Sequence, residues 1–312
     1  MDQPTKTKRL AGSRLARHKS LVAYSFILPN YLGFAVFTLI PVVCSVLLSF
    51  MKWNGSAAPE WIGLDNYIGL FANIGKLSDS FGPALRNTIV YTALSVPLTM
   101  ACSLGLALLL NSQIRGRDFF RTIAFFPYIA SLIAVSTVFK LLFIPNDNGL
   151  INGILKAVSG FTVKWTTEQW GIYFMAILFS IWKNMGYYMV IYLAGLQGVN
   201  KELYESAALD GASKWQRFVY VTIPEISLAN FFVMIMLIVN SFKVYDVFYQ
   251  LFAGPDNVLG KKTTILVYEI FAAGLRGNNN FGKASAISMV LFALVLAVTL
   301  IQFRGERRFT NR

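Results

Sequence analysis

The chain has 312 residues, of which 55% are hydrophobic and only 14% are charged. This composition is too apolar for a soluble globular domain and indicates a protein that lies in a lipid bilayer. The formal net charge of +13 does not require a nucleic-acid partner, because membrane proteins concentrate Lys and Arg on their cytoplasmic side.

Six hydrophobic segments are long enough to cross a bilayer. The first occupies residues 21–51 and follows a basic stretch at residues 1–20. It is longer than the apolar core of a cleaved signal peptide, which has about 7 to 15 residues, so we expect it to be retained. The other five are close to the roughly 20 residues that a membrane helix needs. They lie at residues 88–110, 122–144, 171–195, 226–242 and 284–303.

The distribution of Lys and Arg orients these spans. With the N-terminus inside, the segments assigned to the cytoplasm carry 16 Lys and Arg residues, and the longer segments assigned to the outside carry 10. An excess of basic residues marks the cytoplasmic side of a membrane protein. The count therefore predicts that both termini, and the connection between the fourth and fifth spans, are cytoplasmic.

This connection, at residues 200–224, is polar and amphipathic, and its sequence predicts two short helices. Asn200 can cap the first helix, and Gly211 can end it in the left-handed conformation that glycine adopts at little cost. Ser213 and Gln216 have the spacing of a capping box, which would start the second helix. A helical hairpin with a fixed turn is therefore expected on the cytoplasmic side.

The two helices of this hairpin differ in character. The second has an apolar face, and Pro224 is expected to stop it. The first carries small side chains beside one carboxylate, which makes a flat surface that the backbone of another protein could approach. The hairpin thus suits docking, although an ordinary structural hairpin remains open on these grounds. The apolar face of the second helix consists of Trp215, Phe218, Val219 and Thr222.

A DNA-binding helix-turn-helix is a further interpretation of the same hairpin. Its charge argues against this, because residues 200–225 carry three basic and four acidic side chains, a net charge of −1. Binding to the phosphate backbone requires a positive surface. No nucleic acid is therefore expected as a partner.

Polar residues inside the spans are candidates for a pathway, because polar groups are costly to bury in lipid. One group interrupts the fourth span, and another gathers where the fifth span meets the outer face. Lys183 and Lys243 could line a pathway, snorkel to the interface or form structural ion pairs. The tyrosines could instead be interface anchors. The pathway candidates are Asn184, Tyr187, Tyr188, Asn240, Ser241, Tyr245 and Asp246.

The sequence gives little indication of a catalytic or metal site. The one histidine, His18, lies in the basic tail, so a histidine-based triad or a cluster of histidine ligands is excluded. Cys44 and Cys102 lie in apolar segments and are expected to be packing residues. Residues 277–284 fit the G-x-x-x-x-G-K pattern of a phosphate-binding loop, but an alanine stands where Ser or Thr must hold magnesium. The chain is not expected to be an enzyme or to bind a metal or cofactor itself.

Several motifs carry a resemblance to one family. The stretch at residues 204–212 (YESAALDGA), followed by Trp215 and residues 223–224, resembles the EAA loop in permease subunits of binding-protein-dependent ABC importers. Ser206 stands where that family usually has alanine. The chain is most similar to the carbohydrate branch, which includes the maltose and glycerol-3-phosphate transporter permeases. Further similar stretches lie at residues 63–67, 84–88, 115–121, 126–128 and 281–286.

The resemblance implies an all-α, polytopic type I importer permease in the bacterial inner membrane, with six transmembrane helices and a cytoplasmic coupling loop. It also implies a second, different permease chain, two cytosolic ATPases that hold ATP and Mg, an external solute-binding protein and a carbohydrate substrate. The turn at residues 252–255 departs from the family pattern. The residues implied for coupling to the ATPase are Glu205, Ser206, Ala207, Ala208, Asp210, Gly211, Ala212 and Pro224.

The alternative function is an ion-gradient-driven secondary transporter of small polar solutes. It predicts broken helices in corresponding positions of two halves and acidic residues at mid-membrane, and neither is clear in the sequence. An integral membrane enzyme is disfavoured because no catalytic cluster is recognisable. The expected organisation is a basic tail (1–20), a first helix with an external loop (21–83), the importer transmembrane domain (84–303) and a C-terminal tail (304–312).

Overall fold

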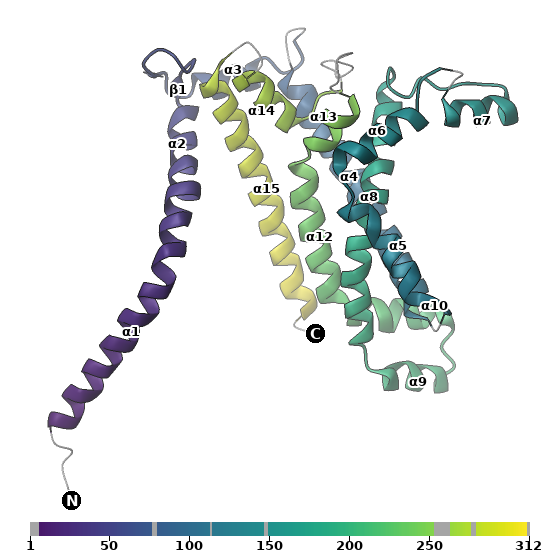
Figure 1. Ribbon diagram of the computed structural model, residues 1–312, viewed down its shortest axis with the longest axis horizontal. Helices are drawn as coiled ribbons and strands as arrows, with labels where there is room; N and C mark the ends of the chain where they lie inside the picture. Colours follow the sequence, from purple (N-terminus) through teal and green to yellow (C-terminus); the bar gives the residue numbers. More distant parts are fainter. Residues whose placement is uncertain are drawn as a thin grey trace, which may run out of the picture.

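The computed structural model describes residues 6–76, 80–112, 114–146, 149–252, 263–275 and 279–310. Helices make up nearly all of this structure, and the long ones run from one end of the molecule to the other (Figure 1). Short helices and a small pair of strands gather at the end that is uppermost in Figure 1, and α9 (Lys201–Leu209) lies at the opposite end. The all-α fold expected from the sequence is confirmed.

Four helices in the described parts of the chain are unbroken, apolar and long enough to cross a membrane. The first is a rod made of α1 (Lys6–Phe34), the π-helical turn η1 (Ala35–Leu39) and α2 (Ile40–Ser49). The others are α4 (Phe81–Asn111), α8 (Gln169–Gln197) and α15 (Phe281–Thr310). The rod already begins inside the basic stretch, because Lys, Arg, Ala and Leu are good helix formers.

Two bent pairs of helices are further candidates for a crossing. The helices α5 (Arg117–Ile129) and α6 (Leu132–Leu142) meet at 96°, and the stretch Lys214–Glu225 meets α12 (Ser227–Phe242) at 70°. If each pair is one crossing, the described chain has up to six, in agreement with the sequence. The span predicted at residues 122–144 is not one continuous helix, because the backbone leaves the helical conformation at Ala130 and Ser131.

Pro224 does not stop the second helix of the hairpin, contrary to expectation. The chain passes from α10 (Lys214–Arg217) through the π-helical turn η2 (Phe218–Thr222) into α11 (Ile223–Glu225), and it bends only at Ile226. In the π turn, the amide of Ile223 donates to the carbonyl of Phe218, five residues earlier. This wider turn accommodates the proline, whose ring clashes with the carbonyl four residues earlier in a regular α-helix.

The uppermost end in Figure 1 is tied together by contacts between distant segments. Asn66 Nδ2 donates to the carbonyls of Ser49 and Met51, both at 2.9 Å. Asn87 Nδ2 in α4 donates to the carbonyl of Thr264 at 2.7 Å. These bonds anchor the ends of the long helices. The elements at this end are the antiparallel pair β1 (Met51–Lys52) and β2 (Glu60–Trp61), α3 (Asp65–Ala72), α7 (Leu150–Ser159), α13 (Asp246–Phe252) and α14 (Leu266–Leu275).

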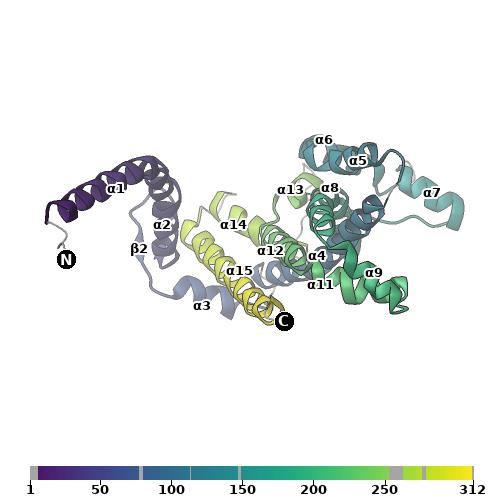
Figure 2. The same cartoon turned by 90° about the horizontal axis from the view of Figure 1, so that it is seen from below.

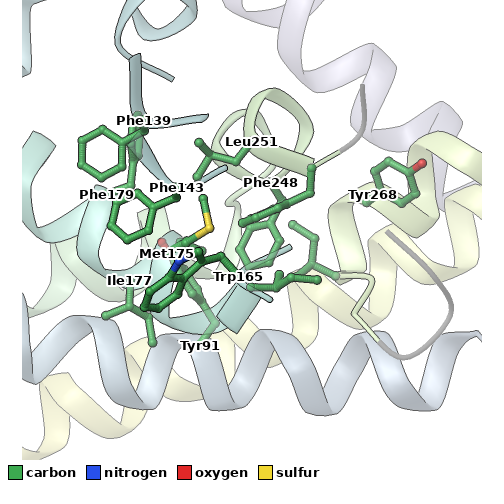
Figure 3. Packing of buried hydrophobic residues seen from close by; sticks show 14 residues of the cluster. Tyr91, Phe139, Phe143, Trp165, Met175, Ile177, Phe179, Phe248, Leu251 and Tyr268 are labelled. Carbon is green, nitrogen blue, oxygen red and sulfur yellow. The ribbon is translucent and has the colours of Figure 1, made fainter. Parts of the chain in front are cut away.

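Three hydrophobic clusters hold the bundle together. The cluster in Figure 3 joins α4, α6, α8 and α13 through aromatic rings. Phe139 meets Phe179 edge to face with ring centroids 4.9 Å apart, and Tyr91 meets Phe248 in the same way at 5.3 Å. A second cluster joins α4, α8 and α12, and a third joins α15 to α4 and α14. Packing of this kind fixes the helices that surround the candidate site.

The rod of α1 and α2 leans away from the bundle and contacts it mainly where α2 packs on α15 (Figures 1 and 2). Most of its apolar side chains are exposed, including Phe26 and Phe37. A surface of this size and character suits lipid or another membrane subunit, and not water.

Candidate functional site

Polar side chains from several helices surround a cavity of about 350 Å³. Its walls come from α4, the end of α5, the middle of α8, the C-terminal end of α12 and the start of α13. The structure therefore brings together two groups of candidates from different spans, whose part in transport stays a prediction. All seven pathway candidates line the cavity: Asn184, Tyr187, Tyr188, Asn240, Ser241, Tyr245 and Asp246.

The wall that α4 contributes was not predicted. Tyr91, Ser95 and Thr99 line the cavity and follow one another at intervals of four residues, so they share one face of the helix. This polar stripe in an apolar span is the signal that could have identified them. Tyr128, at the end of α5, also lines the cavity, and nothing in its sequence context indicated this.

Hydrogen bonds between helices fix these walls. The hydroxyl oxygens of Tyr91 and Ser180 lie 2.6 Å apart, which joins α4 to α8. Asn240 Nδ2 donates to the hydroxyl oxygen of Tyr188 at 3.3 Å, which joins α12 to α8. Asn184 Nδ2 donates to the carbonyl of Ser180, one turn earlier, at 2.8 Å. The middle of the cavity therefore presents amide and hydroxyl groups in fixed positions.

Tyrosine rings form one side of the cavity. Tyr128 and Tyr187 stack with ring centroids 4.5 Å apart and 16° between their planes. Tyr187 also meets Tyr188 edge to face at 5.1 Å. Aromatic faces next to amides and hydroxyls can bind a solute that combines hydroxyl groups with apolar faces.

Lys183 and Lys243, whose roles the sequence left open, lie in different environments. Lys243 lines the cavity. Lys183 lies outside it, and its Nζ donates to the backbone carbonyls of Pro127 and Ala130 at 3.1 and 2.9 Å. Lys183 therefore binds the backbone of the neighbouring bent span, an arrangement that was not among the expected ones.

The hairpin has the caps that its sequence predicts. At the start of α9, Asn200 Oδ1 accepts from the amide of Glu202 at 3.0 Å. Gly211 has a φ of +78°, the left-handed conformation. Ser213 and Gln216 form the reciprocal capping box at the start of α10. The two helix starts and the turn between them are confirmed.

The first helix of the hairpin exposes most of the residues that were predicted to form a docking surface. Glu205, Ser206 and Ala208 are exposed, and Ala207 is half-buried. Leu209, an apolar residue that the sequence did not single out, is 90% exposed. Of the other residues implied for coupling, Asp210, Gly211 and Pro224 are exposed and Ala212 is half-buried.

The second helix of the hairpin exposes large aromatic side chains. Trp215 is 71% exposed and Tyr220 is 77% exposed. Thr222 is buried, and its hydroxyl lies 3.0 Å from that of Tyr204, which fastens the two helices to each other. A rigid hairpin with exposed apolar side chains has the character of a protein docking surface.

Two sequence features fall partly outside the described residues, namely residues 253–255 of the divergent turn and residues 277–278 of the stretch similar to a phosphate-binding loop. The described end of that stretch opens α15, where Gly282 packs against the backbone of Met51. The side chain of His18 is also outside the described part. Among the residues that are described, no group of three potential ligands could hold a metal ion.

Comparison with known proteins shows to which family this chain belongs. Residues 100–310 match the family described as the binding-protein-dependent transport system inner membrane component. The chain belongs to this family. It is therefore a multi-pass permease subunit of a binding-protein-dependent ABC importer, and not an enzyme.

Named relatives align with most of the permease. The arabinooligosaccharides transport system permease protein AraP of Halalkalibacterium halodurans is 32% identical over 292 residues, which cover 92% of this chain and 89% of the relative. The sn-glycerol-3-phosphate transport system permease protein UgpA of Yersinia pestis is 30% identical over 96% of this chain and 98% of its own. The lactose transport system permease protein LacF of Rhizobium radiobacter is 29% identical, with 95% and 97% covered.

A solved structure shares the fold of the permease. The crystal structure of a bacterial alginate ABC transporter, in complex with an alginate pentasaccharide-bound periplasmic protein, contains a similar chain with a TM-score of 0.80 and 24% identity. The match covers 94% of this chain and 96% of that chain. The type I permease fold is thus confirmed.

Proposed function

We propose that this permease forms part of the translocation pathway for a carbohydrate. The cavity carries the proposal, because stacked tyrosine rings beside amide and hydroxyl groups suit a solute with apolar ring faces and many hydroxyls. The relatives support it, since their names refer to arabinooligosaccharides, lactose and sn-glycerol-3-phosphate.

The complete importer is proposed to contain three further kinds of subunit: a second, different permease, two cytosolic ATPases that hold ATP and Mg, and an external solute-binding protein. Membrane lipid surrounds the permeases. The exposed hairpin, with Glu205, Leu209 and Trp215, offers the ATPase a docking surface. The exposed rod of α1 and α2 offers lipid and the second permease an apolar surface.

The mechanism is proposed to be alternating access. ATP-driven closure of the ATPases would draw together the hairpins docked on them. The hairpin continues through Ile226 into α12, whose outer end carries Asn240 and Ser241. The 16 residues of α12 make a rigid lever of about 24 Å. Movement of the hairpin is thus transmitted to a wall of the cavity.

We propose that the hairpin and both termini face the cytoplasm. Ser20→Cys and Ser213→Cys, both at exposed positions, should resist a membrane-impermeant thiol reagent in intact cells and react after permeabilisation. The background lacks Cys44 and Cys102. Ala57→Cys, in the turn between β1 and β2, should react in intact cells and serves as the control. Labelling of Ser20→Cys or Ser213→Cys without permeabilisation would reverse the orientation.

The carbohydrate proposal is tested on the purified complex. We expect the permease to co-purify with ATPase subunits whose hydrolysis rises when the solute-binding protein is loaded with lactose, maltose, trehalose, arabinotriose or sn-glycerol-3-phosphate. Stimulation by an amino acid, with none by any of these five compounds, would contradict the proposal.

A further inference from the structure

Lys183 lies where a charge is costly. It is the central residue of the 29-residue helix α8, so in a membrane it lies near the middle of the bilayer. A charged side chain at that depth needs polar partners within the protein, because hydrocarbon offers none. The groups that Lys183 contacts therefore decide how it is tolerated.

The ammonium group of Lys183 binds three backbone carbonyls of the neighbouring bent span. Nζ lies 3.1 Å from the carbonyl oxygen of Pro127, 3.4 Å from that of Tyr128 and 2.9 Å from that of Ala130. An ammonium group has three donors and no acceptor, so three carbonyls match its hydrogen-bonding capacity. A cation is also favoured at the C-terminal end of a helix, where the helix dipole is negative.

These carbonyls need a donor because α5 ends among them. Its last helical bond runs from the amide of Ala130 to the carbonyl of Phe126, and the next helix begins with the bond from Val135 to Ser131. Ala130 and Ser131 are extended, with ψ values of 144° and 127°. The carbonyls of residues 127–130 therefore lack helical amides, and the hydrocarbon supplies no water in their place.

The Lys183 ammonium group and the break between α5 and α6 each supply the hydrogen-bond partners that the other lacks. A straight helix through residues 130–131 would satisfy its own carbonyls and would leave Lys183 without these acceptors. The bent form leaves the carbonyls open, and Lys183 binds them. The 96° bend between α5 and α6 is therefore favoured by one side chain of α8.

The bend also sets one wall of the cavity. Tyr128 lies in the last turn of α5, and its ring stacks on Tyr187 while its carbonyl accepts from Lys183. Tyr187 follows Lys183 by one helical turn, so the two side chains lie on the same side of α8. Between them, Gly186 allows the backbone of Ala124 to approach α8 closely. Thus α8 holds both the carbonyl and the ring of Tyr128.

We propose that Lys183 is a positioning residue of the pathway, whose ammonium group fixes the break between α5 and α6 and so holds the Tyr128 ring against Tyr187 as a wall of the cavity. The inference rests on the proposed function, because it takes this cavity as the pathway. Lys183 itself does not touch the transported solute. Its effect on transport is exerted through Tyr128.

The geometry can be tested without a substrate. Spin labels on Leu141→Cys in α6 and Val190→Cys in α8, both exposed, report the arrangement of the two helices in the assembled, otherwise cysteine-free complex. Lys183→Met should shift or broaden the distance distribution, and Lys183→Arg should largely restore it because the guanidinium group also donates to carbonyls. Lys140→Met, in the last turn of α6, is the matched control and should leave the distribution unchanged.

Transport kinetics test whether Lys183 acts through Tyr128. The probe is labelled lactose, maltose, trehalose, arabinotriose or sn-glycerol-3-phosphate, whichever of them stimulates the purified complex. Lys183→Met should raise KM about tenfold, equivalent to about 1.4 kcal/mol, with a smaller change in the maximal rate. Tyr128→Ala should raise KM similarly. The double variant should be no worse than either single variant, because both changes remove the same wall.

Two results would overturn the proposal. One is an unchanged distance distribution in Lys183→Met, whatever happens to uptake. The other is a double variant in which the two effects on KM multiply, since Lys183 would then act independently of Tyr128. If Lys183→Met does not assemble, Lys183→Gln must show the shift instead, because it lacks the charge and has two donors in place of three. If no carbohydrate is transported, the proposed function fails, and the distance measurement still decides the geometry.

Discussion

Gly211→Asp is expected to weaken binding of the ATPase and thereby to abolish uptake, while the permease still reaches the membrane. Gly211 has a φ of +78°, and a Cβ added there would have no atom of this chain beyond its two neighbouring residues within 4 Å. Aspartate is one of the few residues that adopt this conformation, so the local strain is only about 1 kcal/mol. The larger effect arises in the docked state, because a new carboxylate buried at a protein contact costs several kcal/mol. A cost of about 3 kcal/mol would weaken ATPase binding about 100-fold.

The matched control for this change is Gly160→Asp. Gly160 ends α7 with a φ of +76° and also has open space around it, but it lies at the opposite end of the molecule. ATPase co-purification, stimulated hydrolysis and uptake are measured in one preparation. Gly160→Asp should behave as the wild type. If Gly211→Asp keeps assembly and stimulated hydrolysis but changes which sugar is transported, the hairpin is not the coupling element.

Gly186→Val is also expected to reduce uptake strongly, but by displacing α5 and not by weakening ATPase binding. Gly186 is buried in α8 at its crossing with α5, and an added Cβ would overlap the carbonyl oxygen of Ala124 and lie 2.8 Å from the Cα of Phe125. These are backbone atoms, so α5 as a whole must move away. Overpacking of this kind costs about 1 to 3 kcal/mol or more. Because α5 carries Tyr128, the shift also opens the cavity wall, and we expect uptake to fall at least about tenfold.

Gly105→Val provides the control for the valine itself. Gly105 is inside α4, and apart from its sequence neighbours and the backbone of its own helix no atom of this chain lies within 4 Å of the position that its Cβ would take. This variant carries the same change in helix propensity without the clash. Thermal unfolding of the purified complex and sugar uptake are compared for the two variants. Equal losses in both, or full activity of Gly186→Val, would show that the close crossing of α5 and α8 does not matter for transport.

The hairpin could be predicted because its signals are local. Asn200, Ser213 and Gln216 bond to backbone atoms two or three residues away, and Gly211 sets its own backbone conformation. Hydrophobic length likewise predicts the unbroken spans without knowledge of their neighbours. By contrast, the route past Pro224 depends on a π turn that sequence periodicity does not reveal.

The bend between α5 and α6 could not be predicted because its cause lies on another helix. Residues 130–131 are Ala and Ser, the nearest proline is Pro127 inside α5, and Lys183 is 53 residues from Ala130 in the sequence. The cavity could be predicted only in part. The polar stripe of Tyr91, Ser95 and Thr99 was visible in the sequence, but only packing decides which face of α4 meets α8.

Bent crossings are also a feature that an ion-gradient-driven secondary transporter predicts. Family membership favours the ATP-driven importer, and the two functions differ most clearly in their source of energy. The coupling role of the hairpin follows only if that source is a cytosolic ATPase.

The most direct test is uptake of the stimulating sugar into sealed vesicles that contain the purified complex. We predict that uptake requires the solute-binding protein outside, the ATPase subunits and ATP on the side of the hairpin, and that it continues when proton and sodium gradients are collapsed. Uptake by this chain alone, driven by a proton or sodium gradient and indifferent to ATP, would contradict the account.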